Sequence, residues 1–310
     1  MKRALARWAC AAAVVLSAGC GLGEGDERPG GATLRVTRDF GRVELGSAAT
    51  DALREGGTVM RFLRSEFDVE TRFGGGFVQS IDGLAGEGSS GHRDWFFFVN
   101  GVESEVGAAE YELSPGDRIQ WDLRPWQAAM RVPAIVGAFP EPFRSGLEGK
   151  RRPVRVECEE AGDETCRDAK AALERTGVPV SGASLGAPGT ETVVRLVVAP
   201  WPQVGIVRGA STLEDGPKKS GVFARFDDDD RSLELLDEDG EVVRTVRPGD
   251  GTALVAALRP RDEELVWLVT ALDDAGLAAG VAALREGKLR DAFAVAVTGS
   301  NVEKLPLVRQ

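Results

Sequence analysis

The stretch Asp94-Trp-Phe-Phe-Phe-Val-Asn-Gly101 decides how the first part of this 310-residue chain folds. Side chains alternate between the two faces of a strand, so every second residue from Trp95 shares one face, and Phe96 and Phe98 share the other. Both faces are apolar, which predicts a central strand that is covered on each side. Asn100-Gly101 then supplies the positive φ angles that a two-residue type I′ turn needs.

A second strand is expected in Arg118-Ile-Gln-Trp-Asp-Leu-Arg124, directly after the turn residues Pro115-Gly116-Asp117. Its apolar residues alternate with Gln120, Asp122 and Arg124, as they do in a strand that is buried on one face only.

Upstream of both strands, the pattern predicts a hairpin and then a helix. Leu34 and Val36 alternate with polar residues, as do Val43 and Leu45, with Gly41 between the two runs. Thr58 is a suitable N-cap for a helix whose apolar residues recur at helical spacing. The order of two strands, a helix and further strands predicts an α+β, β-grasp-like N-terminal domain over residues 32–127.

Four motifs in this domain carry a resemblance to a known family. They are Thr58-Val-Met-Arg-Phe-Leu63, Phe77-Val-Gln-Ser-Ile-Asp-Gly83, the stretch 95–101 and Gly116-Asp-Arg-Ile-Gln-Trp121. Together they resemble the transcobalamin C-terminal-like domain of secreted bacterial proteins, a family without an established general function, over about residues 58–124. In animal carriers the similar domain closes over bound cobalamin, so the resemblance implies a corrinoid as a ligand.

The N-terminus predicts export. Three basic residues precede an apolar stretch from Ala9 to Leu16, and Leu16-Ser-Ala-Gly-Cys20 resembles a bacterial lipobox. This stretch is too short to span a bilayer. We expect a lipoprotein signal peptide at 1–19, a lipid on Cys20 that anchors the protein outside the cell membrane, and a flexible tether at 20–31. The alternative is an ordinary cleaved signal with an incidental cysteine.

Charge excludes one class of partner. The net charge is −11, with 38 Lys and Arg against 49 Asp and Glu. Without residues 1–19 the basic count falls to 35 and the net charge becomes −14. Nucleic acid is not expected as a partner, because phosphate binding needs a basic face. Contact with the membrane is expected through the lipid alone.

Two cysteines remain once Cys10 and Cys20 are assigned to the signal and the lipid. An even pair in an exported chain is typically a disulfide, which predicts a Cys158–Cys166 bridge. A metal site is the alternative, but two cysteines without a nearby histidine do not complete a zinc shell. We therefore expect no metal and no cofactor.

The rest of the chain is expected to form a connecting arm and a second domain. Residues 128–152 contain prolines that exclude a regular helix, and apolar residues that predict a fixed, packed arm. From 153 to 310, alternating strand and helix patterns predict a mixed α/β domain. Two similar strand-helix-strand units, at 154–199 and 265–297, hint at an internal repeat.

Catalytic signals are weak. His92 is the only histidine, and its Gly-Ser-rich loop offers no partner for a triad. The acidic run 227–230 lacks the ligand spacing of an EF-hand. The sequence predicts no enzyme, although a pair of carboxylates acting as in glycosidases leaves no spacing signature and stays open.

Binding is the function that the sequence favours. Aromatic rings with a few polar groups suit an amphipathic ligand or a partner surface. The candidate ligand-binding residues are Phe77, Trp95, Asn100, Tyr111, Trp121 and Trp126. The first hypothesis is a cell-surface lipoprotein that binds a small molecule such as a corrinoid and passes it to a membrane importer. The alternative is an adhesion or assembly lipoprotein that contacts another envelope protein. An aromatic cleft between the domains would favour the first, and a flat apolar patch the second.

Overall fold

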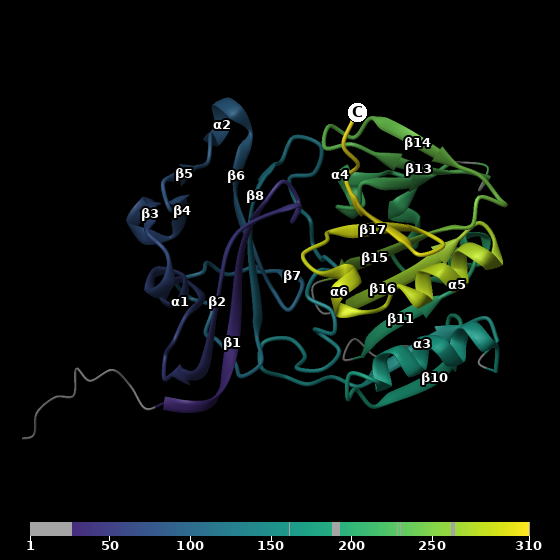
Figure 1. Ribbon diagram of the computed structural model, residues 1–310, viewed down its shortest axis with the longest axis horizontal. Helices are drawn as coiled ribbons and strands as arrows, with labels where there is room; N and C mark the ends of the chain where they lie inside the picture. The colour runs from purple at the N-terminus through teal and green to yellow at the C-terminus, as the bar shows by residue number, and fades with distance from the viewer. Residues whose placement is uncertain are drawn as a thin grey trace, which may run out of the picture.

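The computed structural model describes residues 27–160, 162–187, 193–227, 229, 231–261 and 264–309. Its architecture is α+β, with most of the chain in sheets and few helices (Figure 1). The predicted signal peptide 1–19 and Cys20 lie outside the described residues. The first strand begins at Glu27 and pairs with a neighbour, so the tether prediction for 20–31 is wrong for residues 27–31.

A five-stranded sheet forms the N-terminal domain, in the order β2-β1-β8-β6-β7. Its strands are β1 (Glu27–Arg38), β2 (Val43–Arg54), β6 (Arg93–Val99), β7 (Val102–Glu103) and β8 (Arg118–Pro125). β1 runs parallel to β8, and the other pairs are antiparallel. Only the two-residue β7 adjoins β6 on its outer side, so the prediction that β6 is central is wrong for most of its length. The predicted turn is present, because Asn100 and Gly101 have φ angles of 53° and 78°.

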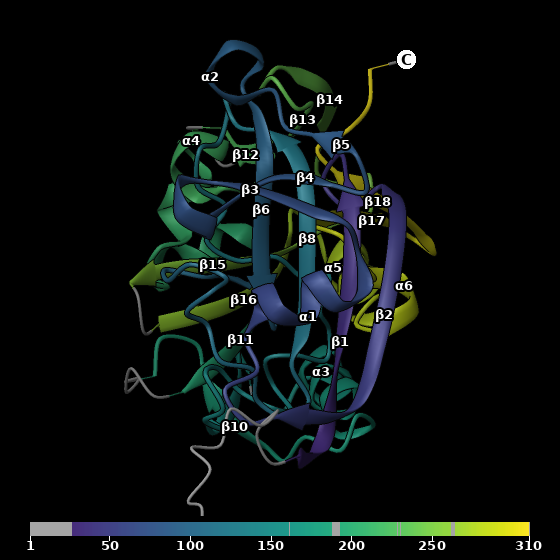
Figure 2. The ribbon, with the colours of Figure 1, turned by 90° about the vertical axis from the view of Figure 1, so that its left-hand side faces the viewer.

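One face of this sheet carries a small helix and a second sheet (Figure 2). These elements are α1 (Val59–Glu66), β3 (Val69–Arg72), β4 (Phe77–Ile81), β5 (Leu84–Ala85) and the short α2 (Gly88–Gly91). The side chain of Thr58 accepts a hydrogen bond from the Arg61 backbone N–H, so the predicted N-cap is confirmed. Leu34, Leu63 and Ile119 are fully or almost fully buried in the core between these layers.

The other face of the sheet packs against the rest of the chain. Gln120, Asp122 and Arg124 point to this side and are buried, so β8 is covered on both faces and not on one. Phe40 and Phe98 enter the same core as Phe293, with ring centroids 5.2 Å and 5.3 Å from it. The second cover that the apolar pattern of 94–99 requires is therefore the second domain.

The connecting segment 128–152 is packed against both domains, as expected. It contains turns and no regular helix or strand. Val132, Ile135, Val136, Phe139 and Phe143 are all buried in the two cores that this segment shares with the C-terminal domain.

The C-terminal domain is built on a seven-stranded sheet in the order β10-β9-β11-β16-β15-β17-β18. The strands are β9 (Val154–Cys158), β10 (Val180–Ser184), β11 (Val194–Val198), β15 (Thr252–Arg261), β16 (Glu264–Ala271), β17 (Ala294–Thr298) and β18 (Asn301–Leu305). The first four strands of the order are parallel and the remaining pairs antiparallel. β9 and β11 are neighbours, whereas β15 separates β16 from β17, so the two units of the suggested repeat differ in strand order.

Helices cover one face of the seven-stranded sheet, and a further three-stranded sheet lies across the other. The helices are α3 (Glu164–Glu174), α5 (Asp274–Ala282) and α6 (Glu286–Leu289), and the first two pack side by side (Figure 1). The opposite core contains α4 (Pro217–Ser220), β12 (Ala224–Phe226), β13 (Leu233–Leu236) and β14 (Val242–Val246), preceded by 3-10 turns at Trp201–Ile206 and Ala210–Leu213. A further 3-10 turn spans Phe73–Gly75 in the first domain.

Cys158 and Cys166 form a disulfide that ties the end of β9 to the first turn of α3. Both residues are almost completely buried. We expect the double substitution Cys158→Ser and Cys166→Ser to lower the free energy of unfolding by about 2–3 kcal/mol, because a crosslink restricts the unfolded chain. Denaturant unfolding of the parent with and without reductant provides the control. Equal stability of the oxidised parent and the variant would contradict the prediction.

Candidate functional site

Three of the six aromatic and polar candidates belong to the interior of the first domain. Trp95 and Trp121 are 5% and 3% exposed, and the Trp121 ring stacks on Phe97 with centroids 4.9 Å apart. Asn100 is 1% exposed and donates to the Asp117 carboxylate at 2.8 Å and to the Gly146 carbonyl at 3.0 Å. These contacts give the three residues packing and turn-forming roles.

The other three candidates lie apart from one another. Trp126 is half-buried, and its Nε1 donates to Asp94 at 2.9 Å. Tyr111 lines a pocket of about 260 Å³ beside Glu148 that none of the other five candidates lines. Burial, reinforced by the charges of Asp117 and Glu148, raises the pKa of Tyr111 above its ordinary value. The structure thus does not gather the predicted residues into one cleft.

Phe77 is the most exposed of the six, and it is paired with a residue that the sequence analysis did not select. Phe77 is 38% exposed, and its ring lies 6.3 Å from that of Phe73, which is 86% exposed. Phe73 has a φ of 53°, a backbone conformation that is rare for an aromatic residue. The pair forms an exposed aromatic tip at the β3–β4 turn.

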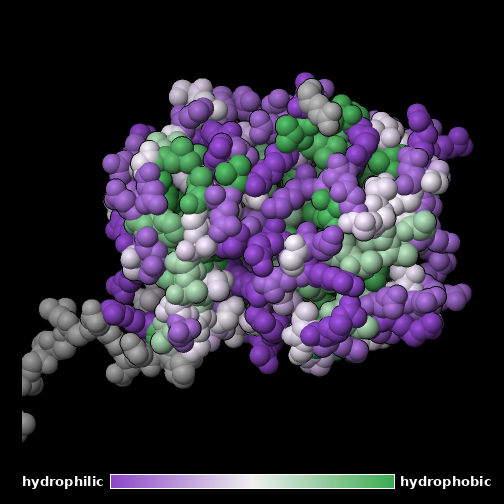
Figure 3. Space-filling model, in the orientation of Figure 1, coloured by the Kyte–Doolittle hydropathy of each residue, from purple (hydrophilic) through white to green (hydrophobic). Residues whose placement is uncertain are grey.

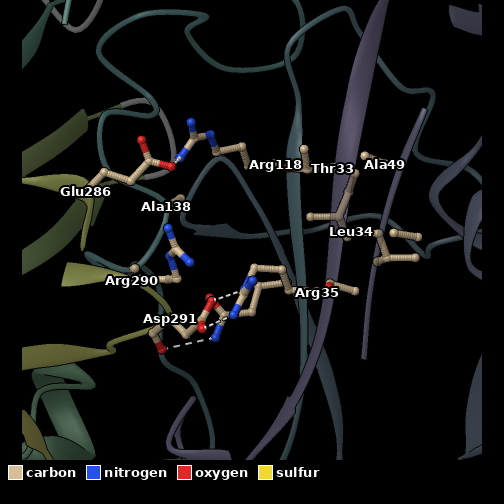
Figure 4. A pocket seen from close by; sticks show the side chains of 14 residues that line it. Thr33, Leu34, Arg35, Ala49, Arg118, Ala138, Glu286, Arg290 and Asp291 are labelled. Atoms are coloured by element: carbon tan, nitrogen blue, oxygen red, sulfur yellow. Dashed lines mark hydrogen bonds and ion pairs between the residues drawn. The ribbon is translucent and has the colours of Figure 1, made fainter. Parts of the chain in front are cut away.

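A pocket of about 440 Å³ does lie between the two domains, and charged side chains from both domains line it beside small and aliphatic residues (Figure 4). From the first domain it takes residues 33–35 of β1, 47–49 of β2 and 118–120 of β8. From the connecting arm and the second domain it takes 137–138, Glu286, Arg290 and Asp291. No aromatic residue lines it, so this pocket is not the aromatic cleft expected for a ligand binder.

Two ion pairs bridge the domains across this pocket. Arg35 of β1 contacts both carboxylate oxygens of Asp291, and its Nη2 also pairs with Glu44 at 2.8 Å. Arg118 of β8 pairs with Glu286 at 2.9 Å. Burial opposes the charge of Arg35, but the hydrogen bonds and charges of Asp291 and Glu44 leave the pKa of Arg35 above its ordinary value.

Arg290 differs from the other two arginines of the pocket. It is exposed, and its side chain extends between the two ion pairs (Figure 4). Its guanidinium makes no hydrogen bond or ion pair with another residue in the part of the chain that the structure describes, although its charge acts on Glu44 from a distance. The pocket therefore offers one unpaired guanidinium, which is suited to a carboxylate or phosphate group.

The sequence analysis missed this site, because its residues come from distant segments. Arg35 and Asp291 are 256 positions apart, and neither belongs to a recognisable motif. One local sequence pattern did relate to this pocket: the alternation in β8 places Arg118 on the same face of the sheet as Gln120. The pattern of 286–291 carried no signal, because α6 is only four residues long.

Metal binding and membrane spanning find no support within the described ranges. No group of three His, Cys, Asp or Glu side chains there is arranged to hold a metal ion. Among the described helices, none is long and apolar enough to cross a membrane.

Comparisons with known proteins find matches to part of the chain only. The chain matches no curated protein. Among solved structures it is similar to one from Ruminococcus gnavus ATCC 29149, described as a "putative metal binding protein", with 22% identity over 31% of this chain and 97% of that one. The TM-score of 0.26 is too low to support an argument about function. Residues 56–124 match the family model "Domain of unknown function (DUF4430)", and neither this match nor the structural one gives evidence for the transcobalamin-like resemblance.

Proposed function

We propose that this protein is a non-enzymatic binder of a small anionic molecule, which it holds in the pocket between its two domains. Arg290 carries the proposal, because it is exposed and its guanidinium has no hydrogen-bonded or ion-paired partner among the described residues. A pocket of about 440 Å³ falls within the range of small-molecule sites, about 300–1,000 Å³. The charge balance adds support, since three arginines and two carboxylates line the pocket of a chain whose net charge is −11.

Sequence motifs support the proposed location of the protein and the proposed class of its ligand. The lipobox-like segment ending at Cys20 supports a protein anchored outside the cell membrane by a lipid, where it could pass its ligand to an importer. The parallel pairing of β1 with β8 beside the β1–β2 hairpin supports a β-grasp-like first domain. The transcobalamin-like motifs make a corrinoid the ligand to test beside simpler anions.

Calorimetric titration of succinate, inorganic phosphate and cobinamide into the purified protein tests the proposal. We expect saturable binding of at least one of the two anions. Arg290→Gln should weaken that binding about tenfold or more, because a hydrogen bond to a charged group is lost. Arg285→Gln is the matched control, since Arg285 is also exposed but does not line the pocket. Binding that Arg290→Gln leaves unchanged would reject the pocket as the site.

Contact with another envelope protein is the second candidate function, and the exposed aromatic tip favours it. Phe73 and Phe77 are 86% and 38% exposed there, and their rings contact each other. Exposed apolar side chains that gather on a surface often mark interaction sites. If none of the three compounds binds to the folded protein, this alternative becomes the better explanation.

A further inference from the structure

A second pocket, about 790 Å³ in volume, lies where β14, β18 and the C-terminal segment meet. Four basic residues line it, namely Arg42, Arg244, Lys304 and Arg309, against the single acid Glu303. Four aliphatic residues complete the lining: Val242, Val243, Leu307 and Val308. A basic group next to an apolar wall is unusual on a protein with a net charge of −11.

Two of these four cations already have carboxylate partners. Arg244 pairs with Glu303, and Arg309 pairs with Asp237. Arg42 and Lys304 have no ion pair within the described part of the chain, and the Lys304 Nζ donates only to the Gly41 carbonyl, at 2.6 Å. Arg42 and Lys304 are therefore the available anion-binding groups of this pocket.

The surroundings of these two groups disfavour their charges in the absence of an anion. Burial lowers the pKa of Arg42, and the carboxylates of Glu238 and Asp122 only partly oppose this from beyond ion-pair distance. Burial also lowers the pKa of Lys304, where the nearby cations Arg35 and Arg42 add to the effect and the carboxylates of Asp291 and Asp122 oppose it. A bound anion would stabilise both cations.

The aliphatic wall is held open to solvent by a local irregularity. A register shift in the β13–β14 pairing leaves Val243 as an extra residue, since Leu236 faces Val242 and Leu235 faces Arg244. A bulge re-aims side chains, which accounts for two consecutive valines lining one pocket. Val242, Val243 and Val308 are 40%, 36% and 62% exposed. Figure 3 shows hydrophobic surface gathered around the C-terminal end at the top of the view.

We propose that this pocket binds an anionic amphiphile, with the acidic head group at Arg42 and Lys304 and the alkyl chain along the valines and Leu307. The site shares no lining residue with the pocket between the domains, so it does not depend on the function proposed above. The same chemistry could come from a free fatty acid or from an anionic lipid in a bilayer.

Titration of decanoate, acetate and 1-decanol into the purified protein tests the site. We expect saturable decanoate binding, and binding of acetate and decanol at least about tenfold weaker, because the site needs both charge and chain. Arg42→Gln and Val308→Asp should each weaken decanoate binding about tenfold. Arg247→Gln and Val106→Asp are the matched controls, since both residues are exposed and neither lines the pocket.

Several outcomes would overturn the proposal. Equal affinity for decanoate and decanol would show that the cations do not contribute and that the pocket is only an apolar patch. Decanoate binding that Val308→Asp leaves unchanged would show that the ligand binds outside this pocket. Val308 follows the last strand, so its substitution tests the site even if Arg42→Gln fails to fold.

Sedimentation with phosphatidylglycerol vesicles distinguishes a free fatty acid from an anionic lipid in a bilayer as the source of the ligand. Vesicle binding that Val308→Asp abolishes identifies a bilayer lipid, and decanoate binding without vesicle binding identifies a free amphiphile.

Discussion

Replacing Arg124 with methionine is expected to lower the free energy of unfolding by about 3–5 kcal/mol, among the largest effects of any single substitution in this protein. Arg124 is fully buried at the boundary between β8 and the connecting arm. Its guanidinium donates to the carbonyls of Ala129 at 2.8 Å and Met130 at 3.1 Å, and it lies 3.8 Å from the centre of the Phe96 ring. Methionine fills similar space but leaves these carbonyls without their donor.

The charge of Arg124 matters as much as its hydrogen bonds. Burial lowers the pKa of Arg124 to about 10, against the opposing charges of Glu103 and Asp122. Asp122 is also fully buried and accepts hydrogen bonds from the backbone N–H groups of Phe40 and Gly41. Without the arginine, both carboxylates lose a nearby buried cation, and an uncompensated buried charge is costly.

Denaturant unfolding of the Arg124→Met variant measures the effect. Arg38→Met in the same sheet is the control, because Arg38 is 43% exposed and its pair with Asp39 should contribute less than about 1 kcal/mol. A variant as stable as the parent, or more stable, would show that apolar packing rather than the buried charge holds this boundary together.

Glu157→Gln is expected to lower the free energy of unfolding by about 3 kcal/mol, through a buried ion cluster in the seven-stranded sheet. The carboxylate is shielded from solvent and accepts two hydrogen bonds from Arg195, at 2.8 Å and 2.7 Å. Arg155 on the same strand adds two further bonds, from Nε at 2.8 Å and from Nη2 at 2.5 Å. Glutamine keeps the shape of the side chain but removes the charge that both arginines share, and Arg195 keeps its pair with Glu264, at 3.1 Å.

The stability lost on replacing Glu157 with glutamine should become smaller as the pH falls. Burial opposes ionisation of Glu157, but the hydrogen bonds and charges of Arg195 and Arg155 outweigh it and hold its pKa below the ordinary 4.5. A carboxyl group with a lowered pKa stabilises the fold above about pH 4.5 and loses that contribution as the pH falls through its folded value. The stability difference between parent and variant should therefore be full at pH 7 and narrow below about pH 4.5.

Urea unfolding of both proteins at pH 7 and at a series of acidic values tests this dependence. Glu234→Gln is the control, since Glu234 also pairs with an arginine across two strands but Arg225 is 43% exposed. That change should cost less than about 1 kcal/mol at any pH. A difference in the free energy of unfolding between the parent and Glu157→Gln that grows as the pH falls would contradict a lowered pKa of Glu157.

Much of the local structure could be predicted from short-range chemistry. The Thr58 cap, the Asn100-Gly101 turn and the pairing of Cys158 with Cys166 each depend on a few neighbouring residues. The strand expected at 118–124 is found as β8. β10 was missed because Val180-Ser-Gly-Ala-Ser184 has no hydrophobic pattern of its own, and only its pairing with β9 makes it a strand.

The aromatic candidates show why the ligand site could not be predicted in the same way. Alternation reveals which residues of β6 and β8 share a face, but not what covers that face. Trp95 and Trp121 are enclosed by α1 and the small sheet, and so became core. The polar residues of β8, which resembled a solvent-facing row, are enclosed by the second domain.

By itself, the sequence determined the α+β class, the turn and cap positions, the disulfide and the existence of a packed arm, because each depends on interactions close along the chain or on composition. The tertiary structure alone decided where charge and cavity coincide. Arg35, Arg118 and Arg290 form one pocket only because the second domain docks on the polar face of the first sheet. Arg42 and Lys304 meet for the same reason. Contacts between residues more than 150 positions apart leave no local pattern in a single sequence.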